Sequence, residues 1–384
     1  MKFELFLSSR IIFELGSRSQ IGEIASSIGN RVILLYAKNH PLVPEIRDQL
    51  KGIGLDLLVL PISGEPDLES VSNFVTEGRI YDSNLVISIG GGSVIDTGKI
   101  ISAMLNNPGE ISDYLEIVGM NLPLQNKPAP FIAVPTTSGT GSEVTKNAVL
   151  VIPAKKIKVS MRSNMMIPQI AIIDPELTVS MPGPVTASTG MDAIIQLIEP
   201  FVSIKANHFV DGLCREAIPL GANSLTQSVA DGMNLRSRED MCFTSLCGGL
   251  ALANAGLGAV HGFAGVIGGM KTVPHGMICA ALLAGTLKIN IEALKKRQPD
   301  SPSTRKFKEL AILLTRNKNA GIFDSVGWAE RVSTEIGIKR LSELGIYEKQ
   351  FPEICEKAAL SSSMKGNPIL LEKGEMLQIL ELSK

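Results

Sequence analysis

The stretch NLVISIGGGSVIDTGKIISAML, residues 84–105, decides the fold class, because it joins a strand-like apolar run to an amphipathic stretch through three glycines. Gly90, Gly91 and Gly92 let a backbone approach a phosphate closely, and the helix that follows begins with free N–H groups and the positive end of its dipole. The pattern is neither G-x-G-x-x-G nor the P-loop pattern G-x-x-x-x-G-K-S/T. A tight turn without a ligand is the plain alternative, but a glycine loop directly after a strand favours phosphate binding.

Four further apolar runs surround this stretch at 31–37, 55–60, 130–135 and 169–175, and amphipathic stretches separate most of them. Short continuous runs that are rich in β-branched residues suit parallel strands covered on both faces. Alternating strands and helices therefore predict an open α/β sheet that binds its ligand at the carboxyl ends of the strands.

The character of the chain changes at MPGPVTASTGMDA, residues 181–193, where Pro, Gly, Ser and Thr concentrate. Beyond it the residue pattern predicts helices almost throughout, at 192–204, 211–227, 238–255, 276–293, 307–314, 327–336 and 347–360. We therefore expect an α/β domain over residues 1–183 and an all-helical domain over residues 184–384.

Composition limits the partners of the protein. The 384 residues carry a formal net charge of −1, which provides no electrostatic footprint for nucleic acid or for an anionic membrane. No segment has about 18 uninterrupted apolar residues, so we expect no membrane span. The five cysteines are an odd number without CxxC spacing, which indicates reduced thiols and a cytoplasmic protein.

A second polar loop, PTTSGTGSEVTK at residues 135–146, follows the strand predicted at 130–135. Its hydroxyl groups and glycines provide short donors that suit phosphate, ribose or adenine. A flexible linker has a similar composition, but the position of the loop at the carboxyl end of a strand favours ligand binding.

Potential metal ligands gather in the predicted helical half. Asp192 opens a predicted helix, and Gln196 follows one turn later on the same face. His261 and His275 are two of only four histidines and lie in glycine-containing segments before and after Pro274. One Asp and two His can hold Zn²⁺ or Fe²⁺ and leave a position for water or substrate. The alternative that each histidine merely packs or caps a helix stays open from the residues alone.

Taken together, GGGSVIDTGK, PTTSGTGSEVTK, MDAIIQLIE and the paired segments GLGAVHG and VPHG resemble the iron-containing (group III) alcohol dehydrogenases in order and approximate spacing. The resemblance implies the dehydroquinate synthase-like architecture, in which a dinucleotide-binding α/β domain and a helical domain hold a metal in the cleft between them. It also implies a homodimer or a larger homo-oligomer.

The match implies two groups of functional positions. The pyrophosphate and nicotinamide end are held at Gly91, Gly92, Ser93 and Asp96, the second cofactor loop contributes Thr136, Thr137 and Ser142, and Lys158 lies near the cofactor ribose. Asp192, His261 and His275 match three of the four metal ligands.

The chain departs from the family pattern at three positions. The fourth ligand is usually His but is Gln196 here, and its amide oxygen coordinates a borderline metal more weakly than imidazole, so the choice between Fe²⁺ and Zn²⁺ is open. Gly265 stands where a further His often occurs, so a proton-relay role cannot be transferred. Ala37 replaces the usual Asp at the adenosine ribose, and Lys38 follows it. Without a carboxylate to repel a 2′-phosphate, we expect NADP(H) to be favoured over NAD(H).

These features predict a metal-dependent oxidoreductase that transfers a hydride between NAD(P)(H) and a small alcohol or aldehyde. One divalent metal, Fe²⁺ or Zn²⁺, is expected to act as a Lewis acid on the substrate oxygen. The sequence identifies no catalytic base. Two alternatives remain: a lyase of the dehydroquinate synthase type, whose Lys- and Arg-rich acid-binding pocket is not apparent, and a catalytically silent nucleotide-binding relative.

Overall fold

The computed structural model describes residues 3–7, 10–155 and 157–384. These residues form two units, which we call the sheet unit, residues 6–180, and the helical unit, residues 181–384 together with residues 3–5. The division between Ser180 and Met181 falls three residues before the boundary predicted at residue 183. Each unit has its own buried hydrophobic core.

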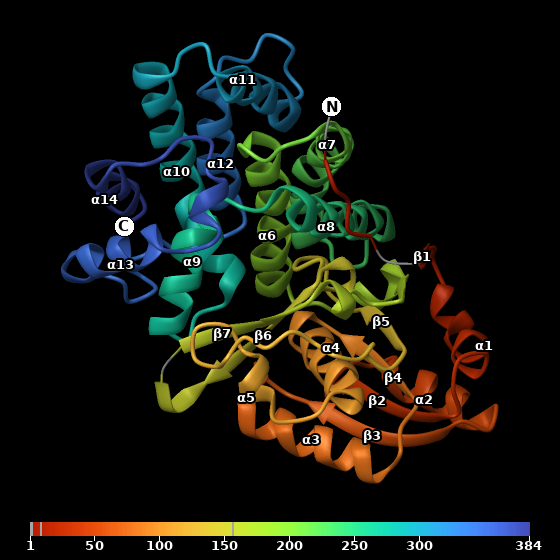
Figure 1. Cartoon of the computed structure of the whole chain (residues 1–384). Helices are drawn as coiled ribbons and strands as arrows, with labels where there is room; N and C mark the ends of the chain where they lie inside the picture. Colours follow the sequence, from red (N-terminus) through yellow and green to blue (C-terminus); the bar gives the residue numbers. More distant parts are fainter. Residues whose placement is uncertain (1–2, 8–9, 156) are drawn as a thin grey trace. The chain divides into compact units, whose positions relative to one another are not determined.

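A six-stranded parallel sheet in the order β1-β8-β5-β4-β2-β3 organises the sheet unit (Figure 1). Its strands are β1 (Arg10–Phe13), β2 (Arg31–Ala37), β3 (Asp56–Ile62), β4 (Leu85–Gly90), β5 (Phe131–Pro135) and β8 (Ile170–Ile173). All five predicted strands are confirmed. Strand β1 and the antiparallel hairpin of β6 (Asn147–Ile152) and β7 (Ile157–Arg162) were not predicted.

Helices cover both faces of the sheet, as the continuous apolar strands require. Side chains alternate along each strand, so Val32 and Leu34 pack with α1 (Ile21–Ser26) and α2 (Val43–Gly52). Ile33 and Leu35 point to the opposite core, which contains α3 (Leu68–Ile80), α4 (Gly92–Asn106) and α5 (Ile111–Tyr114).

The strand order reverses at β2. Chain order runs from β2 to its neighbour β3 and then returns to β4 on the other side of β2. Open α/β sheets bind ligands outside the carboxyl ends of their strands at such a switch point. The ends of β2 and β4, at Ala37 and Gly90, flank this point, and β5 ends beside β4 because Pro135 lies opposite Gly90.

The helical unit is built around α6 (Gly183–Val202), which is buried almost continuously from Thr186 to Val202. The other helices are α7 (His208–Ala230), α8 (Leu235–Ala255), α9 (Ala259–Met270), α10 (His275–Arg297), α11 (Pro302–Thr315), α12 (Asp324–Glu335), α13 (Phe351–Ala359) and α14 (Lys373–Leu382) (Figure 1). The expectation that Asp192 opens a helix was wrong. The helix begins nine residues earlier, at Gly183, since packing of its small polar residues overrides their low helix propensity.

One described helix, α10, is long and apolar enough to cross a bilayer by composition alone. In its most apolar window, 72% of the residues are buried inside the protein. Helices α8 and α9 pass the same test only as a pair, and they are bent by 99°. Core helices of soluble proteins share this composition, so the finding is weak evidence for a membrane span.

Candidate functional site

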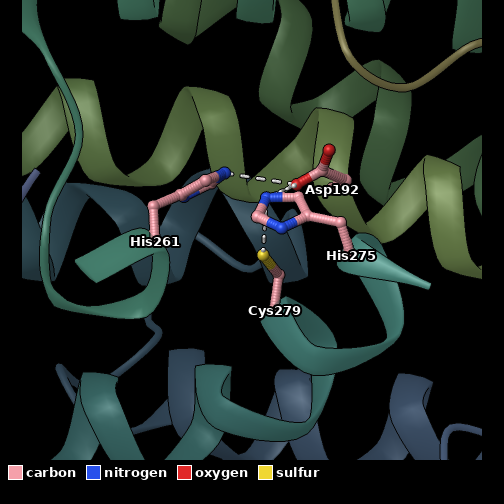
Figure 2. Close-up of side chains that lie close together, drawn as sticks. All are labelled: Asp192, His261, His275 and Cys279. Carbon is pink, nitrogen blue, oxygen red and sulfur yellow. Dashed lines mark hydrogen bonds and ion pairs between the residues drawn. The ribbon is translucent and has the colours of Figure 1, made fainter. Parts of the chain in front are cut away.

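Three helices of the helical unit bring together four side chains of the types that bind metal ions (Figure 2). Asp192 comes from α6, His261 from α9, and His275 and Cys279 from α10. One ligand atom from each residue lies within 4.8 Å of those of the other three. Nε2 of His261 is 3.2 Å and Nε2 of His275 is 4.0 Å from Oδ1 of Asp192, and Sγ of Cys279 is 3.5 Å from Nε2 of His275.

A glycine lets α10 approach α6 closely enough to form this cluster. A Cβ atom on Gly276 would lie 2.1 Å from the backbone oxygen of Ser188, so a larger residue would separate the two helices. Ser188 is one turn before Asp192 on α6, and Gly276 directly follows His275, which is the first residue of α10. The close contact therefore places His275 beside Asp192.

Helix α9 is positioned by side chains from elsewhere in the chain, because its N-cap, Gly258, has no side chain to cap it. Oε1 of Glu199 on α6 accepts from the backbone N–H of Val260 (2.7 Å), and Oδ1 of Asn367 accepts from that of Ala259 (3.1 Å). A carboxylate at this helix start is also favoured by the helix dipole. His261 in the first turn is thus held in place.

Glu199 also fixes the tautomer of His261. Nδ1 of His261 lies 2.7 Å from Oε2 of Glu199, and an ionised carboxylate only accepts hydrogen bonds, so Nδ1–H must donate. In the neutral imidazole, the lone pair is then on Nε2, the atom that faces Asp192. A carboxylate behind a histidine is the usual arrangement at metal sites.

The cluster has unusual proton affinities when it holds no metal. Burial lowers the pKa of His261, but the carboxylates of Asp192 and Glu199 outweigh it and raise the pKa to about 10. Burial raises the pKa of Asp192, yet the neighbouring histidines leave that pKa below its usual value. Burial also raises the pKa of the Cys279 thiol. Without a metal, His261 is therefore a cation between two carboxylates.

Gln196 contacts the cluster through Asp192. Its Nε2 donates to Oδ2 of Asp192 (2.9 Å), which leaves Oδ1 of Asp192 facing the two histidines. Oε1 of Gln196 faces α8, because it lies 3.5 Å from the position of a Cβ atom on Gly248.

Three polar atoms at this site are buried and make no hydrogen bond within the described part of the chain: Oδ1 of Asp192, Oε1 of Gln196 and Nε2 of His261. Oδ1 and Nε2 are close, but they lack the alignment of a hydrogen bond, so they share only charge attraction. Buried polar atoms are almost always satisfied. An oxygen and a nitrogen that converge without such a bond fit a divalent cation.

The two polar loops of the sheet unit lie against each other at the carboxyl edge. A Cβ atom on Gly91 would lie 3.1 Å from Thr137, and one on Gly92 would lie 2.8 Å from Thr140. The backbone N–H of Thr136 donates to the oxygen of Gly90 (3.0 Å). A side chain at position 92 would therefore displace the side chain of Thr140 even before a ligand is considered. Ser93 is half-buried in the first turn of α4.

Asp96 and Ser142 bond to one another. Ser142 donates through its hydroxyl to Oδ1 of Asp96, whose Oδ2 accepts from the backbone N–H of Val149 (2.9 Å). The fully buried Nζ of Lys99 donates to Oγ of Ser142 (2.7 Å) and to Oγ1 of Thr145 (3.0 Å). This network ties the second loop and the hairpin to α4.

The remaining predicted cofactor residues lie around the same edge. Ala37 ends β2 and is half-buried, and Lys38 next to it is exposed. Lys158 on β7 forms an ion pair with Glu65, in the loop that follows β3. The glycine loop and the hydroxyl loop are therefore in contact with each other, while Lys158 is paired with the carboxylate of Glu65.

Three residues at these sites were not assigned from the sequence: Glu199, Cys279 and Lys99. Glu199 follows Asp192 by seven residues and Cys279 follows His275 by four, so helical spacing alone places each on the face of a predicted ligand. Lys99 ends the quoted glycine motif. Its burial depends on the second loop, which local sequence does not reveal.

Comparisons with known proteins agree with this geometry. A family model described as "Iron-containing alcohol dehydrogenase" matches residues 8–175, and one described as "Fe-containing alcohol dehydrogenase family, C-terminal" matches residues 186–383. A 1,3-propanediol dehydrogenase of Citrobacter freundii is 32% identical over 99% of this chain and 97% of its own. An NAD-dependent methanol dehydrogenase of Bacillus methanolicus is 28% identical over 98% of both chains. The solved structure of an alcohol dehydrogenase from Oenococcus oeni has a TM-score of 0.91, with 31% identity and full coverage of both chains.

Proposed function

The chain belongs to the family of iron-containing alcohol dehydrogenases and is an NAD(P)-dependent alcohol oxidoreductase, and from this premise we propose which residues carry its reaction. The family uses NAD(H) and a divalent metal. Asp192, His261 and His275 hold that metal here. The observation that carries this proposal is the convergence of Oδ1 of Asp192 and Nε2 of His261, both buried and without hydrogen bonds among the described residues.

A metal held by these residues would supply Lewis acidity that polarises the oxygen of the alcohol or aldehyde substrate. The side chains of the helical unit prepare this centre. Glu199 keeps the Nε2 lone pair of His261 directed at Asp192, and Gln196 keeps Oδ1 of Asp192 free by bonding Oδ2. Gln196 thus belongs to the proposed site through its contact with Asp192. Fixed ligands of this kind avoid reorganisation during the reaction.

The test is His275→Ala in the full chain, with His208→Ala as a matched control at an exposed helix start. Metal content is measured on protein purified without chelators, together with NAD(P)H-dependent reduction of aldehydes. His275→Ala should lose most metal and activity, while His208→Ala should keep both. Full metal occupancy in His275→Ala would show that the metal is bound elsewhere.

For the dinucleotide, we propose that the first turn of α4 and the two facing loops bind the phosphates. Gly91, Gly92 and Ser93 lie at a helix start that favours anions, and Thr136 and Thr137 lie on the adjacent loop. Asp96, Ser142 and Lys158 support these loops through the contacts described above. The position of all these residues beside the switch point of the sheet supports the assignment.

We further propose that NADP(H) is preferred over NAD(H). Ala37 carries no carboxylate to repel a 2′-phosphate, and exposed Lys38 adds a positive charge next to it. A charge-assisted contact of about 1–3 kcal/mol would give roughly a five- to hundredfold preference. The comparison is kcat/KM for NADH and NADPH in the native protein and in Ala37→Asp. A native preference for NADH, or an unchanged ratio in Ala37→Asp, contradicts the proposal.

The substrate is proposed to be a small alcohol or aldehyde, and the panel should begin with 1,3-propanediol and methanol, for which two relatives are named. We also propose a cytoplasmic homodimer or larger homo-oligomer. All five cysteines are free and buried, which supports a reducing compartment, and light scattering in solution measures the oligomeric state. Family membership favours the oxidoreductase over the lyase and over a silent relative.

A further inference from the structure

We infer that Cys279 is the fourth protein ligand of the metal, so that the centre is an Asp-His-His-Cys site suited to Zn²⁺. The inference rests on the proposed function, because it extends the ligand set formed by Asp192, His261 and His275. It concerns a side chain that the family pattern does not supply as a ligand.

The distances between ligand atoms fit a four-coordinate centre. Nitrogen and oxygen ligands about 2.0–2.1 Å from zinc are about 3.4 Å apart at the tetrahedral angle, and a nitrogen and a sulfur about 3.6 Å apart. In the structure the separations are 3.2 Å for His261 and Asp192 and 3.5 Å for His275 and Cys279, which are close to these values, while the 4.0 Å between His275 and Asp192 is longer. Figure 2 shows the thiol of Cys279 pointing at the ring of His275.

The position of Cys279 is fixed by the same element that fixes His275. The two residues are four apart at the start of α10, so they lie on one face of the helix. Gly276, between them, holds that first turn against Ser188 of α6. The thiol is fully buried, so no solvent-exposed alternative position competes for the side chain.

Gln196 is less suited to the fourth position. An amide coordinates metals through oxygen, and Oε1 of Gln196 faces α8 at Gly248. Reversing the amide would direct Oε1 at Oδ2 of Asp192, and two acceptors would then oppose each other. Gln196 therefore positions Asp192, and the sulfur of Cys279 completes the donor set.

A thiolate changes which metal the centre selects. Soft sulfur ligands favour zinc over metals bound by oxygen and nitrogen alone. Coordination replaces the S–H bond of Cys279 with a sulfur–metal bond and releases one proton to the buffer for each site filled. Four protein ligands leave the substrate oxygen a fifth position, which zinc accepts in transition states.

The test loads chelator-treated full-length protein with Co²⁺ alone and records its absorption spectrum. A thiolate bound to Co²⁺ gives an intense near-ultraviolet charge-transfer band that nitrogen and oxygen ligands do not give. We expect the band in the native protein and in Cys355→Ala, a buried helical cysteine that is not part of the cluster. The band should be lost in Cys279→Ser and Cys279→Ala.

Competition titration with a chromophoric chelator then measures the affinity for Zn²⁺. Cys279→Ser should bind Zn²⁺ at least about 100-fold more weakly, because losing a ligand should cost no less than losing an outer-sphere partner, for which the upper end is about 100-fold. The inference is overturned if the Co²⁺ spectrum of the native protein lacks the band. It is also overturned if Cys279→Ser binds Zn²⁺ as tightly as the native protein does.

Failure of the inference is distinguishable from failure of the proposed function. If His275→Ala loses metal while Cys279→Ser matches the native protein, the three-ligand centre stands and the cysteine is only a packing residue. If His275→Ala keeps its full metal content, both the centre and the inference are wrong.

Discussion

The carboxylate of Glu199 offers the sharpest test of how the metal centre is organised. Glu199→Gln keeps the size of this buried side chain and removes its charge. In the native protein its two oxygens accept from Nδ1 of His261 and from the backbone N–H of Val260, both at 2.7 Å. A glutamine has one acceptor oxygen, so its NH₂ group must face one of these two donors.

Two effects of known size follow from this substitution. The unpaired buried donor destabilises the folded protein by about 1–3 kcal/mol. Losing the carboxylate behind His261 weakens metal binding by about 10- to 100-fold, which is about 1.4–2.7 kcal/mol. The change in metal affinity shows whether Glu199 orients His261 for the metal or only caps α9, because a mere cap would affect stability and leave metal affinity unchanged.

The assay is a Zn²⁺ competition titration of native protein and Glu199→Gln, with thermal unfolding of both metal-free proteins measured in parallel. Glu309→Gln is the control, because Glu309 is a carboxylate at the surface that pairs with Arg215. If Glu199→Gln melts at a lower temperature but binds Zn²⁺ within twofold of the native protein, the residue is a helix cap and our account of His261 is wrong.

Three further predictions follow from the same geometry. In the metal-free protein the pKa of His261 is raised from about 6.5 to about 10, so the protonated ring stabilises the fold fully below pH 6.5 and this stabilisation is lost as the pH rises through about 10. The unfolding temperature of the metal-free protein should therefore fall over this pH range, and it should fall much less when Zn²⁺ is bound. Gly265→Ala should stabilise the protein by about 0.5–1 kcal/mol in denaturant unfolding, since the site is an exposed interior position of α9 where a Cβ atom meets nothing within 4 Å; destabilisation would show that the glycine is required. Gly92→Ala should weaken cofactor binding measured by NAD(P)H fluorescence, because the new Cβ atom would lie 2.8 Å from the side chain of Thr140 and would occupy the approach of the phosphates, and unchanged affinity would remove Gly92 from the site.

The sheet unit was largely predictable because its signals are local. The strand predicted at 31–37 coincides with β2, and β4 begins only one residue inside its predicted run. Continuous apolar runs punctuated by glycine and proline leave few alternatives to buried parallel strands. Strand β1, only four residues long, carries too short a pattern to be read.

Helix α9 shows why part of the helical unit was missed. Its twelve residues, AVHGFAGVIGGM, include four glycines, which is a poor helix sequence by propensity. The helix is stabilised by Glu199 and Asn367, which are 61 and 108 residues away from the groups they cap. No local pattern contains such a contact, so the sequence predicts no helix at this segment.

The proposed metal centre depends mainly on one face of one helix, α6. Asp192, Gln196 and Glu199 lie at positions i, i+4 and i+7 of α6, so they share a face. The three side chains have different roles in the proposed centre, in which Asp192 provides a ligand oxygen, while Gln196 bonds Asp192 and Glu199 bonds His261. Because α6 is buried almost continuously from Thr186 onward, it cannot rotate without disrupting the core of the helical unit. Contacts with α6 hold the other two helices at their first turns, where α9 carries His261 and α10 carries His275. In the proposed centre the metal joins two helix starts to a helix that the core already holds, so a change at one supporting residue of α6 should lower metal affinity in addition to stability.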